Sequence, residues 1–262
     1  MQDDDGIKQY TLSQILLIWA AVTLPMGLAY WVLTPAIADG PFETIITATI
    51  LLTLGLIWQF VLSMILLYRE QGSVGIDAMA RGLWLRLPRH PRTGVPSMVI
   101  FLVAVPIVCA FFIINLLYLS EPILKVWTSV LPFLKPLPYQ EGAALFSPEV
   151  APMLEGAWWF LALFMVLSLF NVFLGEEFLF RGILLPRMSG VFGRFDWVMN
   201  GVLFGLYHVH QPWDTAGIML LGGISLSLAP RLFKSIWLGI IPHSIQTVIV
   251  FVMILGLVSG NS

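Results

Sequence analysis

Long apolar stretches separated by short polar segments form the dominant pattern of this chain. Seven stretches contain no Asp, Glu, Lys or Arg, and they cover residues 11–38, 44–68, 94–120, 156–175, 197–213, 215–230 and 235–258. A helix needs about 20 residues to cross roughly 30 Å of hydrocarbon. The pattern therefore predicts an all-α polytopic membrane protein with about seven transmembrane helices.

One proline-rich segment is the alternative eighth span. Residues 122–138 contain Pro122, Pro132, Pro136 and Pro138 together with two lysines. Proline interrupts helices and lysine is costly in hydrocarbon, so an interfacial or re-entrant piece is the favoured interpretation. The fourth apolar stretch, in contrast, is expected to continue as helix to about Arg187.

Composition points to the same class of protein. Hydrophobic residues make up 58% of the 262 positions and charged residues only 11%, whereas about a quarter of an ordinary soluble domain is charged. The lipid bilayer is therefore the expected environment, and no nucleic acid is expected as a partner. Cys109 is the only cysteine, which excludes an intrachain disulfide.

The basic residues predict the orientation of the chain. With the N-terminus in the cytoplasm, 11 of the 13 basic residues lie on the cytoplasmic side: Lys8, Arg69, Arg81, Arg86, Arg89, Arg92, Arg181, Arg187, Arg194, Arg231 and Lys234. Only Lys125 and Lys135 lie on the other side. Cytoplasmic loops of membrane proteins are enriched in Lys and Arg, so a cytoplasmic N-terminus is expected.

We expect two parts in the chain. Residues 1–150 form N-terminal transmembrane helices with a basic cytoplasmic loop at 69–94, and residues 151–262 form the part that carries the chemistry. Apolar residues and arginines alternate in the loop around Trp84. This pattern is typical of a segment that lies in the headgroup plane and binds anionic lipid, although an ordinary basic loop fits it equally well.

Two adjacent acidic residues, Glu176 and Glu177, follow a long uncharged stretch. Ionisable side chains within a membrane span are costly, and they usually mark a pathway or a reactive site. On a helix, Glu177 and Arg181 are i,i+4 neighbours and can form an ion pair, while Glu176 points about 100° away and stays free. Glu176 is therefore the candidate general base. The structural alternative is a neutralised Glu–Arg bridge without further function.

Two histidines are expected at the same depth as these carboxylates. At 1.5 Å per residue, the glutamates lie about 15–17 Å from the cytoplasmic ends of their helices, His208 about 18 Å and His243 about 14 Å. Such histidines can orient a water, stabilise an oxyanion or bind a metal, or simply form interhelical hydrogen bonds. His210 is expected to point to the opposite side of its helix.

Small residues and proline lie near both histidines. Gly201 and Gly205 precede His208 by seven and three residues, and Pro242 directly precedes His243. Glycine permits the close approach of two helices, and proline permits local bending. We therefore expect tight helix packing beside this site.

Together these residues resemble a known family. The segments Glu176-Glu177-x-x-x-Arg181 and Phe204-x-x-x-His208, followed by His243 in a late span, are similar to the three motifs of the CAAX-protease and bacteriocin-processing (CPBP or Abi) family. Its best-known members, the type II CAAX prenyl endopeptidases, remove the last three residues of prenylated proteins. The resemblance covers roughly residues 155–255.

The resemblance implies a role for each matching position. Glu176 and His208 would activate the hydrolytic water, His243 would stabilise the oxyanion, and Glu177 and Arg181 would support the site. The family commonly has Asn four residues after its last histidine, whereas this chain has Thr247, with Gln246 beside it. Oxyanion support is therefore expected to be weaker or to come from Gln246.

The sequence does not decide whether the protein requires a metal. Glu176, His208 and His243 resemble the ligands of a zinc site, and zinc or another divalent metal is a candidate cofactor. The His-x₃-His spacing of many zinc proteases is absent, however. Both a metallo-type and a glutamate-type endopeptidase are therefore considered.

The leading prediction is an intramembrane endopeptidase that cleaves a membrane-associated or lipidated peptide, in a bacterial-type plasma membrane, with the site open to the cytoplasmic side. A second hypothesis is a membrane scaffold or chaperone of the same fold with little or no turnover, which Thr247 favours. A third is a proton-coupled transporter that uses the buried carboxylates. Paired half-repeats, which are typical of transporters, are not evident here.

Overall fold

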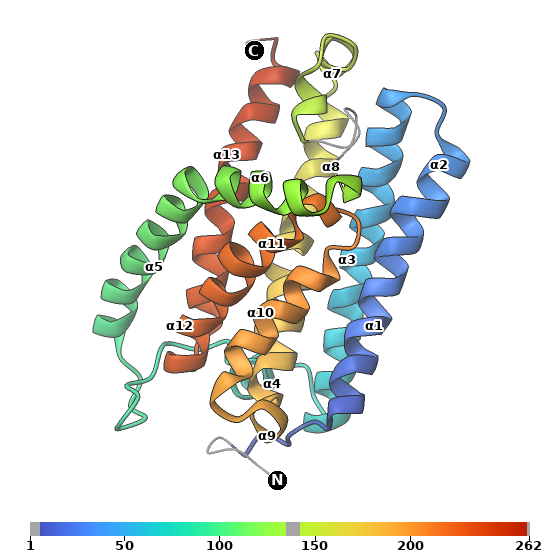
Figure 1. The fold of residues 1–262 in the computed structure, drawn as a ribbon. Coiled ribbons are helices and arrows are strands. Elements are labelled where there is room, and N and C mark those ends of the chain that lie inside the picture. The colour runs from blue at the N-terminus through green and yellow to red at the C-terminus, as the bar shows by residue number, and fades with distance from the viewer. Residues whose placement is uncertain (1–5, 135–141, 261–262) are drawn as a thin grey trace.

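The computed structural model describes residues 6–134 and 142–260, and this part of the chain is built from helices without a strand (Figure 1). Six helical segments are long and apolar enough to cross a membrane: Leu12–Ile37, Pro41–Gln71, Met98–Tyr118, Trp158–Arg187, Pro212–Phe233 and Trp237–Val258. They lie side by side as one bundle. The predicted all-α, multi-pass membrane architecture is confirmed.

The structure has six such helices rather than the seven predicted, because the stretch 197–213 is not one continuous helix. Helix α10 (Asp196–Tyr207) has 12 residues, which corresponds to about 18 Å. A turn and a short 3₁₀ segment at Pro212–Asp214 follow before the next helix begins. An uncharged run predicts that a segment can lie in the membrane, but it does not show that the segment is straight.

The proline-rich segment also forms no span in the described residues. Helix α6 (Ser120–Val130) has 11 residues and lies across the bundle, and Pro132–Leu134 form one 3₁₀ turn after it (Figure 1). The indole nitrogen of Trp127 donates to the carbonyl of Pro212 at 2.9 Å. Residues 135–138, with Lys135, Pro136 and Pro138, lie outside the described residues.

The N-terminal helices have clear boundary signals. Helix α1 (Leu12–Leu28) begins with a capping box between Thr11 and Gln14, and it continues through a wider turn (Ala29–Leu33) into α2 (Thr34–Ile37). Helix α3 (Pro41–Gln71) has proline at its first position and ends at Gly72, whose φ of 68° suits a left-handed cap. Ser97 caps helix α5 (Met98–Tyr118).

The basic loop after α3 folds back onto the protein. It contains helix α4 (Ile76–Gly82), and the following Leu83 and Trp84 are almost completely buried. The N–H of Ile236 donates to the Trp84 carbonyl at 3.1 Å. Leu83 and Trp84 thus pack against protein, whereas Leu87 and Ile76 are exposed, and the interpretation of the loop as a segment in the headgroup plane stays a prediction.

The segment with the two glutamates is the most buried part of the bundle. Helix α8 (Trp158–Ser168) continues into η5 (Leu169–Leu184), a helix with wider turns in which the N–H of Leu185 donates to the carbonyl of Phe180, five residues before it. Such wide turns are rare and often occur at functional sites. A short 3₁₀ turn, η6 (Leu185–Arg187), ends the segment.

The cytoplasmic end of this segment, as predicted from charge, is fixed by one buried arginine. Arg187 donates to both carboxylate oxygens of Glu70 at 2.6–3.1 Å and to the carbonyl of Gly82 at 2.9 Å. Its own carbonyl accepts from the N–H of Tyr10. These bonds join the start of α1, the end of α3 and the end of the glutamate segment.

The remaining helices complete the C-terminal half. Short elements lie at Gly142–Phe146, Ala151–Leu154 (α7), Ser189–Phe192 (α9), Gly193–Phe195 and Thr215–Gly217 (α11). The segment after α11 begins as a wide helix, η9 (Ile218–Ile224), and continues as α12 (Ser225–Phe233). Helix α13 (Trp237–Val258) closes the bundle.

Helix α10 and segment η9 are in backbone contact. A Cβ added at Gly201 would overlap the backbone of Ile224, one at Gly205 would overlap Met219, and one at Gly223 would overlap the carbonyl of Gly201. The expected close packing at Gly201 and Gly205 is confirmed. It brings the end of α10, with His208, against the neighbouring helix.

Candidate active site

Segment η5 places its two glutamates in different surroundings. Glu177 has no exposed surface, and its Oε1 atom lies 3.2 Å from Arg181 Nη1 and 3.0 Å from His243 Nδ1. The pairing of Glu177 with Arg181 that the sequence predicts is present. Glu177 also connects η5 to α13, a contact that the i,i+4 argument did not include.

Arg181 is held by more than Glu177. Its Nη2 atom donates to the carbonyl of Gly222 at 2.7 Å, and its guanidinium carbon lies 4.1 Å from the centre of the Phe204 ring. A cation over an aromatic face is attracted by the negative face of the ring. On the other side, Gly239 has no side chain where Glu177 Oε2 lies, and a Cβ there would overlap it. The pair thus joins four helical segments.

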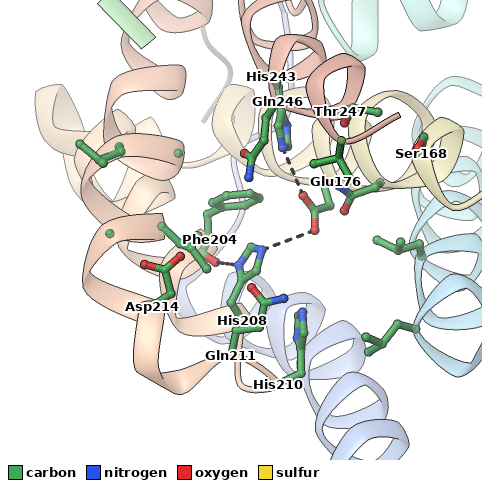
Figure 2. Close-up of a pocket in the computed structure, with 18 of the residues that line it drawn as sticks. Ser168, Glu176, Phe204, His208, His210, Gln211, Asp214, His243, Gln246 and Thr247 are labelled. Carbon is green, nitrogen blue, oxygen red and sulfur yellow. Dashed lines mark hydrogen bonds and ion pairs between the residues drawn. The ribbon is translucent and has the colours of Figure 1, made fainter. Parts of the chain in front are cut away.

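Glu176 instead faces a cavity between two histidines (Figure 2). Its Oε1 atom lies 3.7 Å from His208 Nε2, and its Oε2 atom lies 3.9 Å from His243 Nε2. The structure therefore brings Glu176, His208 and His243 together, from η5, the end of α10 and α13. The expectation that these residues lie in one layer agrees with this geometry.

The outer nitrogens of both histidines are already engaged. His208 Nδ1 lies 2.8 Å from the carbonyl of Phe204, and because a carbonyl can only accept, Nδ1 carries the proton. His243 Nδ1 donates to Glu177 in the same way. Both Nε2 atoms are thereby directed at Glu176. The gaps of 3.7 and 3.9 Å are too long for direct hydrogen bonds and suit a bridging water.

The cavity has a volume of about 310 Å³. Its apolar walls come from α1, α3, α5, α8 and η9. Its polar lining consists of Ser120, Ser168, Asn171, Glu176, His208, His210, Gln211, Asp214, His243, Gln246 and Thr247. Gln246 and Thr247 both lie beside His243, as the sequence argument requires, and Figure 2 shows both at the cavity.

The cavity extends from Glu176 away from the end of the bundle that carries the N-terminus (Figure 1). Ser168 and Asn171 precede Glu176 on a segment that runs toward the N-terminal end, and Thr247 and Val250 follow His243 on a helix that runs away from it. With the predicted cytoplasmic N-terminus, the cavity lies in the opposite half of the membrane. This geometry gives no support to a site open to the cytoplasm.

His210 is in the site, contrary to the expectation that it points away. Helix α10 ends at Tyr207, and the backbone turns at His208. The rings of His208 and His210 therefore lie on the same side, with centroids 5.4 Å apart, and both line the cavity. The helical spacing that placed His210 on the opposite face does not apply beyond residue 207.

Three further residues near the site were not predicted from the sequence. Tyr207 is completely buried beside Glu176, and its hydroxyl accepts from Gln59 Nε2 at 2.6 Å. Asp214 lines the cavity directly after the turn. Pro212 was a signal for that turn, because the residue before a proline rarely continues a helix. No sequence signal identifies Gln59, which comes from the distant helix α3.

The metal requirement stays a prediction. No group of three His, Cys, Asp or Glu side chains that could hold a metal ion is found in residues 6–134 and 142–260. The two histidines face different oxygens of Glu176.

Comparison with known proteins agrees with the motifs. Residues 157–249 match the family model of type II CAAX prenyl endopeptidases, described as Rce1-like. No curated protein and no solved structure matches the chain. The matched region includes both glutamates, Arg181, His208 and His243, which are the residues that meet in the structure. Over residues 157–249, this multi-pass membrane protein is therefore similar to the type II CAAX prenyl endopeptidases.

Proposed function

We propose that this protein is an intramembrane endopeptidase that cleaves a membrane-associated peptide by direct attack of water. The observation that supports this most is the position of Glu176, which is 2% exposed, faces a polar cavity and lies between the Nε2 atoms of two histidines. A buried carboxylate with an accessible water can act as a general base. A covalent intermediate is not required.

The first step uses Glu176 and His208. A water held between Glu176 Oε1 and His208 Nε2 loses a proton to the carboxylate as its oxygen attacks the scissile carbonyl. The Phe204 carbonyl holds the His208 ring in the orientation that leaves Nε2 as an acceptor. The proton on Glu176 can then move to the leaving amine, which restores the carboxylate.

The second requirement is stabilisation of the oxyanion. His243 Nδ1 donates to Glu177 at 3.0 Å, so its Nε2 can donate to the oxyanion only after taking up a proton, whereas Gln246, one helical turn further along α13, offers an amide N–H. Prepositioned donors of this kind contribute more in a water-poor site than in solution, and loss of one typically costs about 10²–10³ in kcat. Glu177 and Arg181 have a positioning role, since neither lines the cavity.

The decisive experiment compares peptide cleavage in proteoliposomes by the wild type, Glu176→Gln and His208→Ala. We expect both variants to lose at least 10²-fold in kcat, because each loses a group that acts on the water. Glu149→Gln is the matched control, because Glu149 is exposed and does not line the cavity. Equal cleavage by all four proteins would refute the mechanism.

A chelator arm of the same assay addresses the metal. We expect cleavage to persist after dialysis against chelator, and metal analysis of the purified protein to show less than one equivalent. Loss of cleavage that returns with zinc would instead assign a metal-dependent route. If the Glu176→Gln variant still performs the cellular role of the wild type, this result would favour the scaffold hypothesis.

A further inference from the structure

Asp214 is a carboxylate in the cavity without a partner among the described residues. It lies between the 3₁₀ turn Pro212–Asp214 and α11, it is half-buried, and it lines the same cavity as Glu176. Figure 2 shows its carboxylate in the space beside His208 and Gln211. Across residues 6–134 and 142–260, its side chain forms no hydrogen bond or ion pair, and it makes no cap bond to α11.

The described residues supply no cation for this carboxylate. The described residues that line the cavity include no Lys or Arg. Arg181, which lies beneath the cavity, is directed at Glu177 and the carbonyl of Gly222. Ionisable groups at membrane depth normally pair with another group, and an unpaired one marks a functional site. The missing partner of Asp214 is therefore expected on the ligand.

The local backbone holds Asp214 in this position. Its N–H donates to the carbonyl of Gln211 at 3.0 Å, and Trp127 of helix α6 fixes the adjacent Pro212 carbonyl. Gly217 leaves room for the carboxylate, because a Cβ there would lie 2.5 Å from Asp214 Oδ1. The position of the acid is thus determined by packing from two sides.

His210 provides a second, independent observation at the same wall. It is 6% exposed, it lines the cavity, and its Nδ1 atom is buried without a hydrogen-bond partner. A buried polar atom that stays unsatisfied in the free protein is costly and needs an explanation. The cavity thus presents an unpaired carboxylate and an imidazole that nothing in the reaction uses.

We propose that Asp214, in the same cavity lining as His210, forms a subsite that binds a basic side chain, Lys or Arg, of the peptide substrate beside the scissile bond. This inference rests on the proposed peptidase function and specifies its substrate class. The cationic group would pair with the Asp214 carboxylate. Charge-assisted hydrogen bonds of this kind are stronger than neutral ones.

The same charges disfavour a substrate with a free C-terminal carboxylate in this cavity. Such a carboxylate would meet Glu176 and Asp214, and the described lining offers no Lys or Arg to bind it. The subsite therefore favours an internal, basic segment of a membrane-associated peptide over a short C-terminal tripeptide.

The test uses sets of membrane-anchored peptides that differ only in having Lys, Met or Glu at each position flanking the cleaved bond. In proteoliposomes, we expect wild type to prefer Lys at one of these positions by about tenfold or more in kcat/KM. Asp214→Asn should bring that ratio close to one, and Asp214→Lys should reverse it in favour of Glu. Gly217→Ala keeps the charge but displaces the carboxylate, and it should also lower the ratio. Glu149→Gln should leave the ratio unchanged.

Binding of the same peptides to the Glu176→Gln protein separates this inference from the proposed reaction. Tighter binding of the Lys peptide that disappears in Glu176→Gln/Asp214→Asn supports the subsite, even if the wild type cleaves nothing and the proposed reaction fails. Equal binding and equal cleavage of the Lys and Met peptides, or a Lys preference that survives Asp214→Asn, would overturn it.

Discussion

At the scale of single residues, two adjacent carboxylates differ because of what each one contacts. Glu177 is enclosed by Arg181 and His243, whereas Glu176 has the Tyr207 hydroxyl beside it and faces two histidine rings across gaps that suit a water. Removing one partner of a buried ion pair leaves the other charge uncompensated, at a cost of about 3–5 kcal/mol. Substitution of Glu177 or Arg181 is therefore expected to lower the stability of the protein more than substitution of Glu176 does.

Position 246 is the residue-scale test of oxyanion support. Gln246→Leu keeps the volume and removes the amide donor, and we expect it to lower kcat by about 10²-fold with little change in KM. Thr247→Val, which removes one hydroxyl beside it, should lower kcat less than tenfold. Single-turnover cleavage by both variants checks this, and a larger effect at Thr247 than at Gln246 would contradict it.

The sequence predicts contacts well for side chains on a helical segment or directly at its end. The i,i+4 spacing of Glu177 and Arg181 and the shared depth of Glu176, His208 and His243 could be predicted because rise and turn per residue are nearly constant. His210 and Asp214 could not be placed, because the chain leaves the helix at residue 208. Gln59 and Tyr207 met only through the packing of α3 against the rest of the bundle.

At the scale of elements, the contact between α10 and η9 sets the position of His208. Both backbones approach each other through glycines, so small shifts at this contact move the end of α10 relative to Glu176. The sequence indicated the contact through Gly201 and Gly205. It did not indicate that α10 has only 12 residues, although Pro212 marks the region in which the helix must end.

Adjacent glycines on η9 give a matched pair of variants. Gly223→Ala places a methyl group against the backbone of Gly201, whereas a Cβ at Gly222 would lie 3.5 Å from Phe204 Cε1 and 3.9 Å from Ile218 Cγ2, both ordinary contacts. We expect Gly223→Ala to lower the melting temperature in detergent by several degrees, since overpacking typically costs about 1–3 kcal/mol. Gly222→Ala should change it little. Equal melting temperatures for the two variants would mean that this contact adapts.

At the scale of the whole molecule, an interrupted helix lies inside a hydrophobic bundle. Irregular backbone at membrane depth is tolerated only where protein covers it or where it lines a water-filled cavity. The turn from His208 to Asp214 meets both conditions. Helix α6 covers it through Trp127, and the turn lines the polar cavity. The break that supplies the polar residues is thus also what allows water to reach them.

A packed layer below Glu176 closes the cavity, and we call this layer its floor. Below Glu176, the buried guanidinium of Arg181 lies over the Phe204 ring, and Phe180, Ile183 and Leu184 have no exposed surface. A closely packed apolar layer that excludes water opposes the passage of protons and cations. The floor of the cavity should therefore block ions as well as support the carboxylates.

The consequence is a membrane that remains impermeable to ions although the cavity admits water to about half its depth. We expect proteoliposomes with wild-type protein to hold an imposed pH gradient as long as protein-free vesicles do, as followed with an entrapped pH-sensitive dye. Rapid collapse of the gradient would favour the transporter hypothesis. A stable gradient would mean that a cell can maintain many copies of this protein in an energised membrane without a loss of ion-motive force.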